Sequence, residues 1–222
     1  MLDRYELSQE IKIVGKAIGF QEVGISLALP SFHFPFYERW LEKGYHGKMM
    51  YLKKHEPIKK DPRHLFPQAK SIISCALKYK TYSEWGDEYH VVMKKKLKEL
   101  FNKIQEFAPE VKGYVCCDTA PLLEKSFAQC AGLGWIGKNT LLIHPHYGSH
   151  VFLGEILINI ELERDPLLVN QCGSCQKCVE ACPTKAFMAP YELDARRCIS
   201  YEAPGCEVCQ EVCPWNKEKN FS

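Results

Sequence analysis

The spacing of apolar residues predicts the first helix of the chain. Four of them recur at intervals of four, three and four residues: Leu7, Ile11, Val14 and Ile18. Residues at this spacing share one face of an α-helix, so the pattern predicts an amphipathic helix. A longer stripe predicts a second helix and consists of Met93, Leu97, Leu100, Phe101, Ile104 and Phe107. Asp87 is a candidate N-cap of that helix, and Pro109 follows its end.

Continuous apolar runs predict the strands. Such runs occur at residues 23–25, 71–77, 114–117 and 151–162, and they are typical of strands buried on both faces. A helix is expected over residues 122–130, and a partly helical, aromatic stretch over residues 34–54. The sequence therefore predicts a mixed α+β body with about four strands among helices.

Cysteine usage distinguishes the last part of the chain from the rest. The 222 residues include 12 cysteines, and eight of these fall in the last 51 residues. The run from Cys172 to Pro183 has the C-x2-C-x2-C-x3-C-P spacing of bacterial ferredoxins. The run from Cys206 to Pro214 repeats its second half, and Cys198 can supply the missing ligand. The four other cysteines are expected to be small buried residues: Cys75, Cys116, Cys117 and Cys130.

Two 4Fe-4S clusters account for this spacing, because the fourth cysteine of such a run ligates the other cluster. We expect a short helix to start at that cysteine. One cluster is predicted on Cys172, Cys175, Cys178 and Cys213, and the second on Cys182, Cys198, Cys206 and Cys209. A disulfide framework would require a secreted chain, and no apolar signal segment is present. A zinc site would lack the x3-C-P element.

Charge and composition both change near Arg164. The first 160 residues carry 22 basic and 17 acidic side chains, whereas residues 161–222 carry 7 and 10. We therefore predict one domain over residues 1–164 and a cluster-binding domain over residues 165–222. No run approaches the roughly 18 apolar residues of a membrane span, so a cytoplasmic location without a membrane partner is expected.

A glycine-rich segment, GLGWIGKNT at residues 132–140, matches two familiar patterns only in part. It contains G-x-G-x-x-G, but the dinucleotide fingerprint follows a strand, whereas this segment follows an expected helix. It contains G-x4-G-K, but Asn139 stands where a P-loop has Ser or Thr. Such a loop suits close approach to a large polar cofactor. The alternative is a helix C-cap followed by a turn.

Taken together, these motifs resemble the epoxyqueuosine reductases. The matching stretches are residues 61–67 (DPRHLFP), 86–90 (GDEYH), 118–125 (DTAPLLEK), 132–140, 154–157 (GEIL), 189–201 (APYELDARRCISY) and 213–216 (CPWN). The resemblance covers nearly the whole chain. It implies a nitroreductase-like cobalamin-binding domain followed by a small ferredoxin-like domain with two 4Fe-4S clusters. It also implies reduction of epoxyqueuosine to queuosine in tRNA, the last step of queuosine biosynthesis, with cobalamin bound base-off.

The resemblance gives Asp118 the role of proton donor. A free carboxylic acid is ionised at neutral pH, so a donor needs surroundings that favour its protonated form. From the residues alone, Asp118 is as well explained as a helix cap, because Asp-Thr-Ala-Pro is a good helix start. The candidate cobalamin contacts are Asp118, Gly137, Lys138, Asn139, Leu142, Gly148 and Ser149, of which Leu142 alone reads as a core residue. Tyr89, His90 and Trp135 are expected near the substrate base or the corrin.

Two departures from the family pattern bear on tRNA. Seven residues separate Cys198 from Cys206, fewer than is usual in the family, and the sequence stops at Ser222 without the family's helical-repeat domain. We expect cluster binding to survive both departures and tRNA binding to be weakened. The candidate tRNA surface consists of Lys94, Lys95, Lys96 and Lys98 together with Lys53, Lys54, Lys59 and Lys60.

Two other functions share these features. One is a corrinoid reductive dehalogenase-like enzyme, which would also use cobalt and clusters. The other is a truncated, non-catalytic electron-transfer protein that only holds clusters. An external electron donor is expected in each case, and a monomer is the expected oligomeric state.

Overall fold

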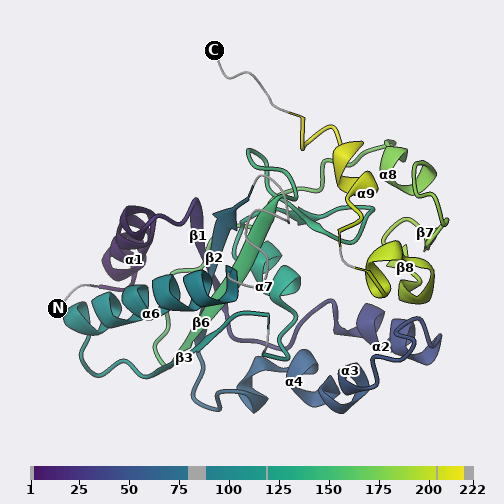
Figure 1. Ribbon diagram of the computed structural model, residues 1–222. Coiled ribbons are helices and arrows are strands. Elements are labelled where there is room, and N and C mark those ends of the chain that lie inside the picture. Colours follow the sequence, from purple (N-terminus) through teal and green to yellow (C-terminus); the bar gives the residue numbers. More distant parts are fainter. Residues whose placement is uncertain (1–2, 80–88, 119, 204, 218–222) are drawn as a thin grey trace.

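A four-stranded antiparallel sheet lies at the centre of the computed structural model, which describes residues 3–79, 89–118, 120–203 and 205–217 (Figure 1). In spatial order its strands are β1 (Glu22–Leu27), β2 (Ser71–Lys78), β6 (Val151–Ile158) and β3 (Gly113–Cys116). All four predicted strands are present. The last ends at Ile158 instead of residue 162, because Asn159 leaves the ladder and its side chain accepts a hydrogen bond from the Lys112 amide at 2.8 Å.

Two helices cover one face of this sheet, α1 (Arg4–Ile18) and α6 (Tyr89–Phe107). Their apolar stripes bury Ile11, Met93 and Leu97 against alternate residues of β2 and β6. Asp3 caps α1 through a capping box with Glu6. Both predicted amphipathic helices are therefore confirmed. The proposed cap of α6, Asp87, lies outside the described residues.

Helix α7 (Glu124–Cys130) packs on the opposite face, where Phe127 contacts Ile72 and Leu157. It starts two residues later than predicted, and its N-cap position, Leu123, provides no side-chain cap. Asp118 therefore does not cap this helix, and the alternative explanation for that residue is wrong.

The glycine-rich segment forms a small hairpin after α7. Its strands are β4 (Trp135–Ile136) and β5 (Leu142–Ile143), which the sequence pattern did not reveal because each is only two residues long. Gly134 is required there, since a Cβ atom at this position would lie 2.2 Å from the Ile143 carbonyl oxygen. Neither the dinucleotide fold nor the P-loop fold is formed.

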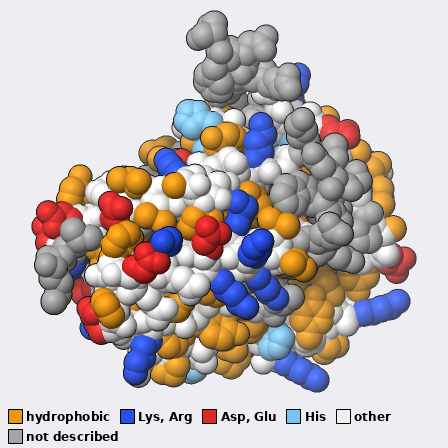
Figure 2. Space-filling view, turned by 60° about the vertical axis from the view of Figure 1, so that its left-hand side comes forward, with side chains coloured by type: hydrophobic (Ala, Val, Ile, Leu, Met, Phe, Trp, Pro, Cys, Tyr) orange, Lys and Arg blue, Asp and Glu red, His pale blue; other side chains and the backbone are white. Residues whose placement is uncertain are grey.

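The stretch predicted to be partly helical, residues 34–54, contains α2 (Phe34–Glu42) and α3 (Tyr51–Lys54), and it is followed by two elements that were not predicted, α4 (Glu56–Lys60) and the 3-10 turn η1 (Pro62–His64). These helices lie beyond the edge of the sheet, below the C-terminal part of the chain in Figure 1. On the other side of the molecule, around α1 and α6, basic and acidic side chains are interspersed with apolar ones (Figure 2). Lys95 and Lys98 are exposed on α6.

The cysteine-rich part forms a module of short elements. They are α8 (Lys177–Glu180), β7 (Phe187–Ala189), β8 (Glu192–Leu193), η3 (Ala195–Arg197), η4 (Ile199–Tyr201) and α9 (Val208–Glu211). The expectation that a helix starts at the fourth cysteine of each run is wrong. Helices α8 and α9 contain Cys178 and Cys209 and end before Cys182 and Cys213, so each helix carries the cysteine that precedes the Cys-Pro element.

Contacts with α2 and with β1 help to hold the cysteine-rich module against the body. On one side, Trp40 Nε1 donates to the Leu193 carbonyl at 2.6 Å, and Lys43 pairs with Glu192 at 2.6 Å. At the start of the module, Asp165 joins the edge of β1, where its carboxylate accepts from the Ile25 amide at 2.9 Å. The domain boundary between residues 164 and 165 stays a prediction. None of the helices in the described part of the chain is long and apolar enough to cross a membrane.

Candidate functional site

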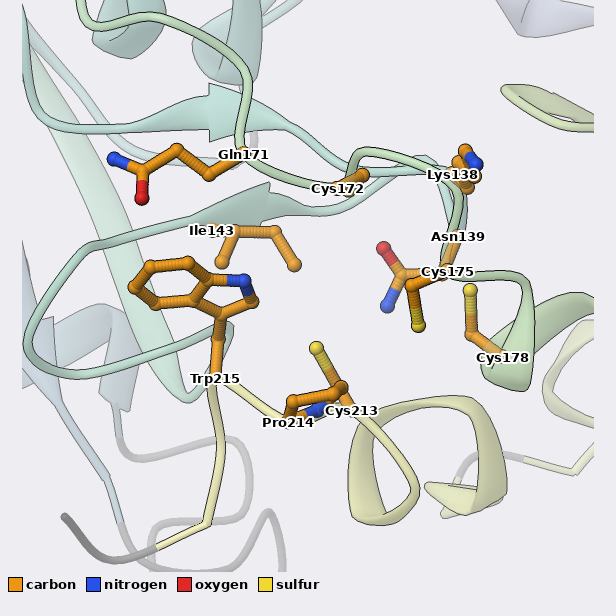
Figure 3. A pocket seen from close by; sticks show the side chains of 10 residues that line it. All are labelled: Lys138, Asn139, Ile143, Gln171, Cys172, Cys175, Cys178, Cys213, Pro214 and Trp215. Atoms are coloured by element: carbon orange, nitrogen blue, oxygen red, sulfur yellow. The ribbon is translucent and has the colours of Figure 1, made fainter.

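Four cysteines from both ends of the module line one cavity of about 280 Å³, which we call the first cavity (Figure 3). These are Cys172, Cys175, Cys178 and Cys213. The sulfurs of Cys175, Cys178 and Cys213 point into the same open space. Lys138, Asn139, Ile143, Gln171, Pro214 and Trp215 complete the lining. The first cavity thus brings together the four residues predicted to hold one cluster.

A smaller cavity of about 30 Å³, the second cavity, is lined by the other four cysteines. These are Cys182, Cys198, Cys206 and Cys209. Cys182 Sγ accepts a hydrogen bond from the Ala186 amide at 3.3 Å. Burial opposes ionisation of the Cys182 thiol, but this bond and those from Thr184 and Lys185 outweigh it and lower the pKa of the thiol. A lowered pKa favours the thiolate, which is the form that binds metal.

The remaining cysteines lie outside both cavities. Cys75, Cys116 and Cys117 are buried in the body, as expected for small core residues, and Cys130 is half-buried in α7. Burial raises the pKa of the Cys130 thiol to about 11, which keeps it protonated at neutral pH.

The glycine-rich loop contacts the module through two buried side chains. Lys138 Nζ donates to the Gly173 carbonyl at 2.7 Å, between the first two cysteines. Asn139 donates to the Cys209 carbonyl at 3.4 Å. Both side chains were predicted to contact cobalamin. In this structure they bind backbone of the cysteine runs, so the loop supports the cavities, and their contact with cobalamin stays a prediction.

The other candidate cobalamin contacts are also occupied by protein groups. Leu142 is a core residue, which was the alternative interpretation of this position. Gly148 exchanges two backbone hydrogen bonds with His144, and Gly137 bonds to Leu141 and Thr140. The amide of Ser149 donates to Asn216 Oδ1 at 2.6 Å. Only Asp118, among the seven predicted contacts, has an exposed side chain, with 61% of it accessible.

Asp118 lies at the end of β3 with its carboxylate beside two residues from the start of α6. The Tyr89 hydroxyl donates to Asp118 Oδ2 at 3.1 Å, and His90 Nε2 lies 3.6 Å from the same oxygen. Burial, and then the Asp118 carboxylate, raise the pKa of the Tyr89 hydroxyl, so Tyr89 remains a donor. Asp118 has a positive φ of 44°, which is rare for a residue other than glycine. The structure thus places two predicted residues, Tyr89 and His90, beside the exposed carboxylate of a third, Asp118.

Trp135, the fourth residue expected near a substrate, is placed differently. Its ring is fully buried and meets the Trp215 ring edge-on at a centroid distance of 4.8 Å. A fully buried ring cannot stack on a substrate base. Trp135 therefore packs behind the first cavity.

Two glutamates behind Asp118 were not singled out as site residues from the sequence. Glu124 Oε1 accepts a hydrogen bond from the Asp118 amide. Its carboxyl group lies within hydrogen-bonding reach of Glu155, which is fully buried at the centre of the sheet. Burial raises the pKa of both carboxyl groups, that of Glu124 to about 7. One sequence signal was available, because Glu155 interrupts the apolar run of β6.

Family models match both parts of the chain. The model described as "Epoxyqueuosine reductase QueG, DUF1730" matches residues 59–119, which include Asp118. The model described as "4Fe-4S double cluster binding domain" matches residues 171–205, which include the first five cysteines of the module.

Relatives and solved structures extend the match to nearly the full chain. An epoxyqueuosine reductase of Leadbetterella byssophila is 40% identical over 95% of this chain and 80% of the relative. That of Escherichia coli is 34% identical over 100% of this chain and 70% of the relative. A crystal structure of an epoxyqueuosine reductase with an epoxyqueuosine-modified tRNA-Tyr stem loop superimposes with a TM-score of 0.88, at 29% identity, over 99% of this chain and 68% of that one.

A reductive dehalogenase, NpRdhA, shares the fold at lower similarity. Its TM-score is 0.66 at 16% identity, and the match covers 97% of this chain but 32% of that one. This likeness shows the fold alone. The identity and coverage of the closer relatives, together with the matching family models, show that the chain belongs to the epoxyqueuosine reductase family.

Proposed function

We propose that this chain reduces epoxyqueuosine to queuosine in tRNA, with electrons delivered through two 4Fe-4S clusters. The observation that carries the proposal is the arrangement of the eight module cysteines in two sets of four around two cavities, in the same chain as an exposed acid held by Tyr89 and His90. The family supplies the substrate, because its relatives are epoxyqueuosine reductases and one was crystallised with modified tRNA.

The cysteines in each cavity fit a 4Fe-4S cluster. Each cluster needs four thiolates, and each cavity is lined by four sulfurs drawn from both cysteine runs. Within the described ranges, no group of three or more His, Cys, Asp or Glu side chains is placed to hold a single metal ion. Four sulfurs around an open space therefore favour a polynuclear cluster over a zinc ion.

Cobalamin is proposed as a further cofactor on the family resemblance. The fit is limited to Asp118, whose side chain is exposed. The other predicted contacts bond to protein groups, among them Lys138 to Gly173 and Asn139 to Cys209. Contact of those residues with cobalamin stays a prediction, and we derive no step through the cofactor.

The chemistry of the substrate defines what the residues at Asp118 must do. Reducing an epoxide to an alkene consumes two electrons and two protons, and the oxygen leaves as water. Asp118 supplies a proton to that oxygen as the carbon–oxygen bond breaks. Tyr89 and His90 hold the carboxyl group in place at 3.1 and 3.6 Å. A one-electron reductant from outside the chain recharges the clusters.

Anaerobic reconstitution followed by turnover tests the proposal. The protein should bind about eight irons, as two cubane clusters require, and should convert the epoxyqueuosine of a tRNA-Tyr stem loop when cobalamin and a one-electron reductant are present. A protein with both clusters and no conversion under these conditions would contradict the proposed reaction and favour an electron carrier. Cytoplasmic location and a monomeric state belong to the same proposal.

A further inference from the structure

The hydrogen bond that orients the Asp118 backbone comes from a residue outside the predicted site. Asp118 has left-handed backbone geometry, and its amide donates to Glu124 Oε1. Glu124 lies in the first turn of α7, six residues further along the chain. A residue with positive φ is strained unless its surroundings compensate. This bond is therefore one of the contacts that keep the Asp118 carboxylate turned toward Tyr89 and His90.

Glu155 lies directly behind Glu124, in the middle of the sheet. It is paired in register with Ser74 of β2 and Cys116 of β3, and none of its surface is exposed. No N–H or O–H group in the described part of the chain donates to either Glu155 oxygen, and Ser74 Oγ is likewise without a partner. An ionised carboxylate is costly in such a place unless it is paired.

The position of Glu124 resolves this difficulty. The two carboxyl groups lie within hydrogen-bonding reach of each other, and two carboxylates can form such a bond only when one is protonated. Glu155 has the more buried position, so it keeps the proton and donates to the Glu124 carboxylate. Burial raises the pKa of both carboxyl groups, that of Glu124 to about 7, so the more buried Glu155 still holds its proton when Glu124 is ionised.

The groups around the pair do not neutralise it. The groups that face it come from five elements: Asp118, Cys116 and Cys117 from β3 and its following loop, Tyr89 from α6, Cys75 from β2, Lys59 from α4 and Lys125 from α7. Burial lowers the pKa of both lysines and raises those of the three cysteines, so the thiols stay neutral. Asp118 adds negative charge, which Lys59 offsets in part.

We propose that Glu124, protonically linked to Glu155, is a positioning residue for Asp118: while the pair shares a proton it holds the Asp118 loop, and loss of that proton releases it. Two adjacent carboxylates would then repel each other. Glu155 is enclosed by the sheet, so Glu124 moves outward from the start of α7 and withdraws its bond from the Asp118 amide. The proposal rests on the proposed function only in taking Asp118 as catalytic.

A related protein shows that such a loop can move. One solved epoxyqueuosine reductase, from Bacillus subtilis, is described with its catalytic aspartate loop swung out of the active site; it is 30% identical to this chain, with a TM-score of 0.88. The Glu124–Glu155 pair gives a physical reason for two positions of the Asp118 loop in this chain.

Residue-resolved hydrogen–deuterium exchange of the anaerobically reconstituted protein tests the inference. In the wild type, protection of the Asp118 amide, corrected for intrinsic exchange, should fall with pH above the midpoint by about tenfold per unit, as loss of one proton requires. Glu155→Gln and Glu124→Gln keep hydrogen-bonding groups but cannot lose a proton, so both should remove this pH dependence. Glu124→Ala should lower protection at every pH, whereas the exposed control Glu161→Gln should change nothing.

Each contrary result would overturn the inference. These are wild-type protection that does not depend on pH, a Glu155→Gln variant with the wild-type dependence, or unchanged protection in Glu124→Ala. Exchange of β2 and β6 amides shows whether a variant has kept the sheet, and Glu124→Gln alters only a half-buried position. The fall of kcat at alkaline pH should be smaller in Glu155→Gln than in the wild type. KM for the stem loop should stay within about twofold, because a positioning residue acts on the reacting step. If exchange behaves as expected but no epoxyqueuosine is reduced, the proposed function fails and the positioning role stands.

Discussion

The side chain of Asn216 bonds to Ser149 in both directions. Its Nδ2 donates to Ser149 Oγ at 2.9 Å, and its Oδ1 accepts from the Ser149 amide at 2.6 Å. The same Nδ2 donates to the Gln210 carbonyl at 2.8 Å. Asn216 follows Cys213 by three residues, so these bonds anchor the last lining segment of the first cavity to the loop before β6.

Replacing Asn216 with Ala should therefore weaken the first cavity. The change leaves the buried Ser149 groups without these partners, which costs about 1–3 kcal/mol. We expect a lower unfolding temperature and faster loss of iron from the reconstituted protein. Asn102→Ala, at an exposed position of α6, is the matched control and should retain iron like the wild type. Equal iron loss in both variants would show that the anchor is unimportant.

The cysteine partition predicts which cluster each substitution damages. Cys182→Ala should disturb the cluster of Cys198, Cys206 and Cys209, because all four line the second cavity. Cys175→Ala should disturb the other cluster. Electron paramagnetic resonance of the reduced protein distinguishes the two centres. Cys130→Ser, outside both cavities, should leave the full iron content. If Cys182→Ala and Cys175→Ala damaged the same centre, the crossed pairing would be wrong.

Asp118→Asn should retain both clusters and lose turnover. A positioned acid contributes about 10²–10⁴-fold to a rate, and the loss should fall in that range. Tyr89→Phe removes a single hydrogen bond to the same carboxylate and should cost less, about tenfold. Conversion of the modified nucleoside, followed by chromatography, measures both. Full activity of Asp118→Asn would remove this residue from the reaction.

The buried carboxyl pair should make stability fall as pH rises. Burial raises the pKa of Glu124 from 4.5 to about 7. Between these values the folded chain holds a proton that the unfolded chain has lost, so the free energy of unfolding decreases with increasing pH, by up to about 1.4 kcal/mol per unit. Above pH 7 the contribution levels off. Glu124→Gln should therefore gain stability relative to the wild type between pH 5 and 7 in anaerobic unfolding experiments. A constant difference across that range would argue against titration of the pair.

The two lysine runs expected to meet tRNA lie in separate layers of the structure. One is on α6, against α1. The other is on α3 and α4, where Lys59 is buried and is therefore not part of the candidate tRNA surface. We expect the α3–α4 run to carry binding, because exposed Tyr51 and Phe36 nearby can stack on bases. Lys53→Gln with Lys54→Gln should lower the salt slope of stem-loop affinity by about 0.7 per lost phosphate contact. The pair Lys95→Gln and Lys98→Gln is the control, and the reverse result would place the RNA on α6.

Local spacing was sufficient to predict which cysteines line the same cavity, and to predict the strands of the main sheet. A cubane cluster needs four thiolates close together. The C-x2-C-x2-C spacing supplies three of them, and the cysteine of the later Cys-Pro element supplies the fourth. The strands β2 and β6 are enclosed on both faces, which is why each appears as a mainly apolar run, interrupted in β6 by Glu155.

The partners of the glycine-rich loop could not be predicted from local spacing. Exposed amides and a lysine suited a polar cofactor, but Lys138 and Asn139 bind carbonyls 35 and 70 residues away. Nothing within the loop itself specifies those partners. Glu155 was missed for a similar reason, because its importance comes from Glu124, on an element of the opposite layer.

The crossing of the two cysteine runs makes assembly of the metal centres interdependent. Neither cavity is lined by one run alone: Cys213 reaches back to the first, and Cys182 forward to the second. A half-made module thus offers three thiolates to one cluster and one to the other. Loss of a whole run should therefore impair both clusters, whereas loss of one cysteine should affect chiefly the cluster that it ligates.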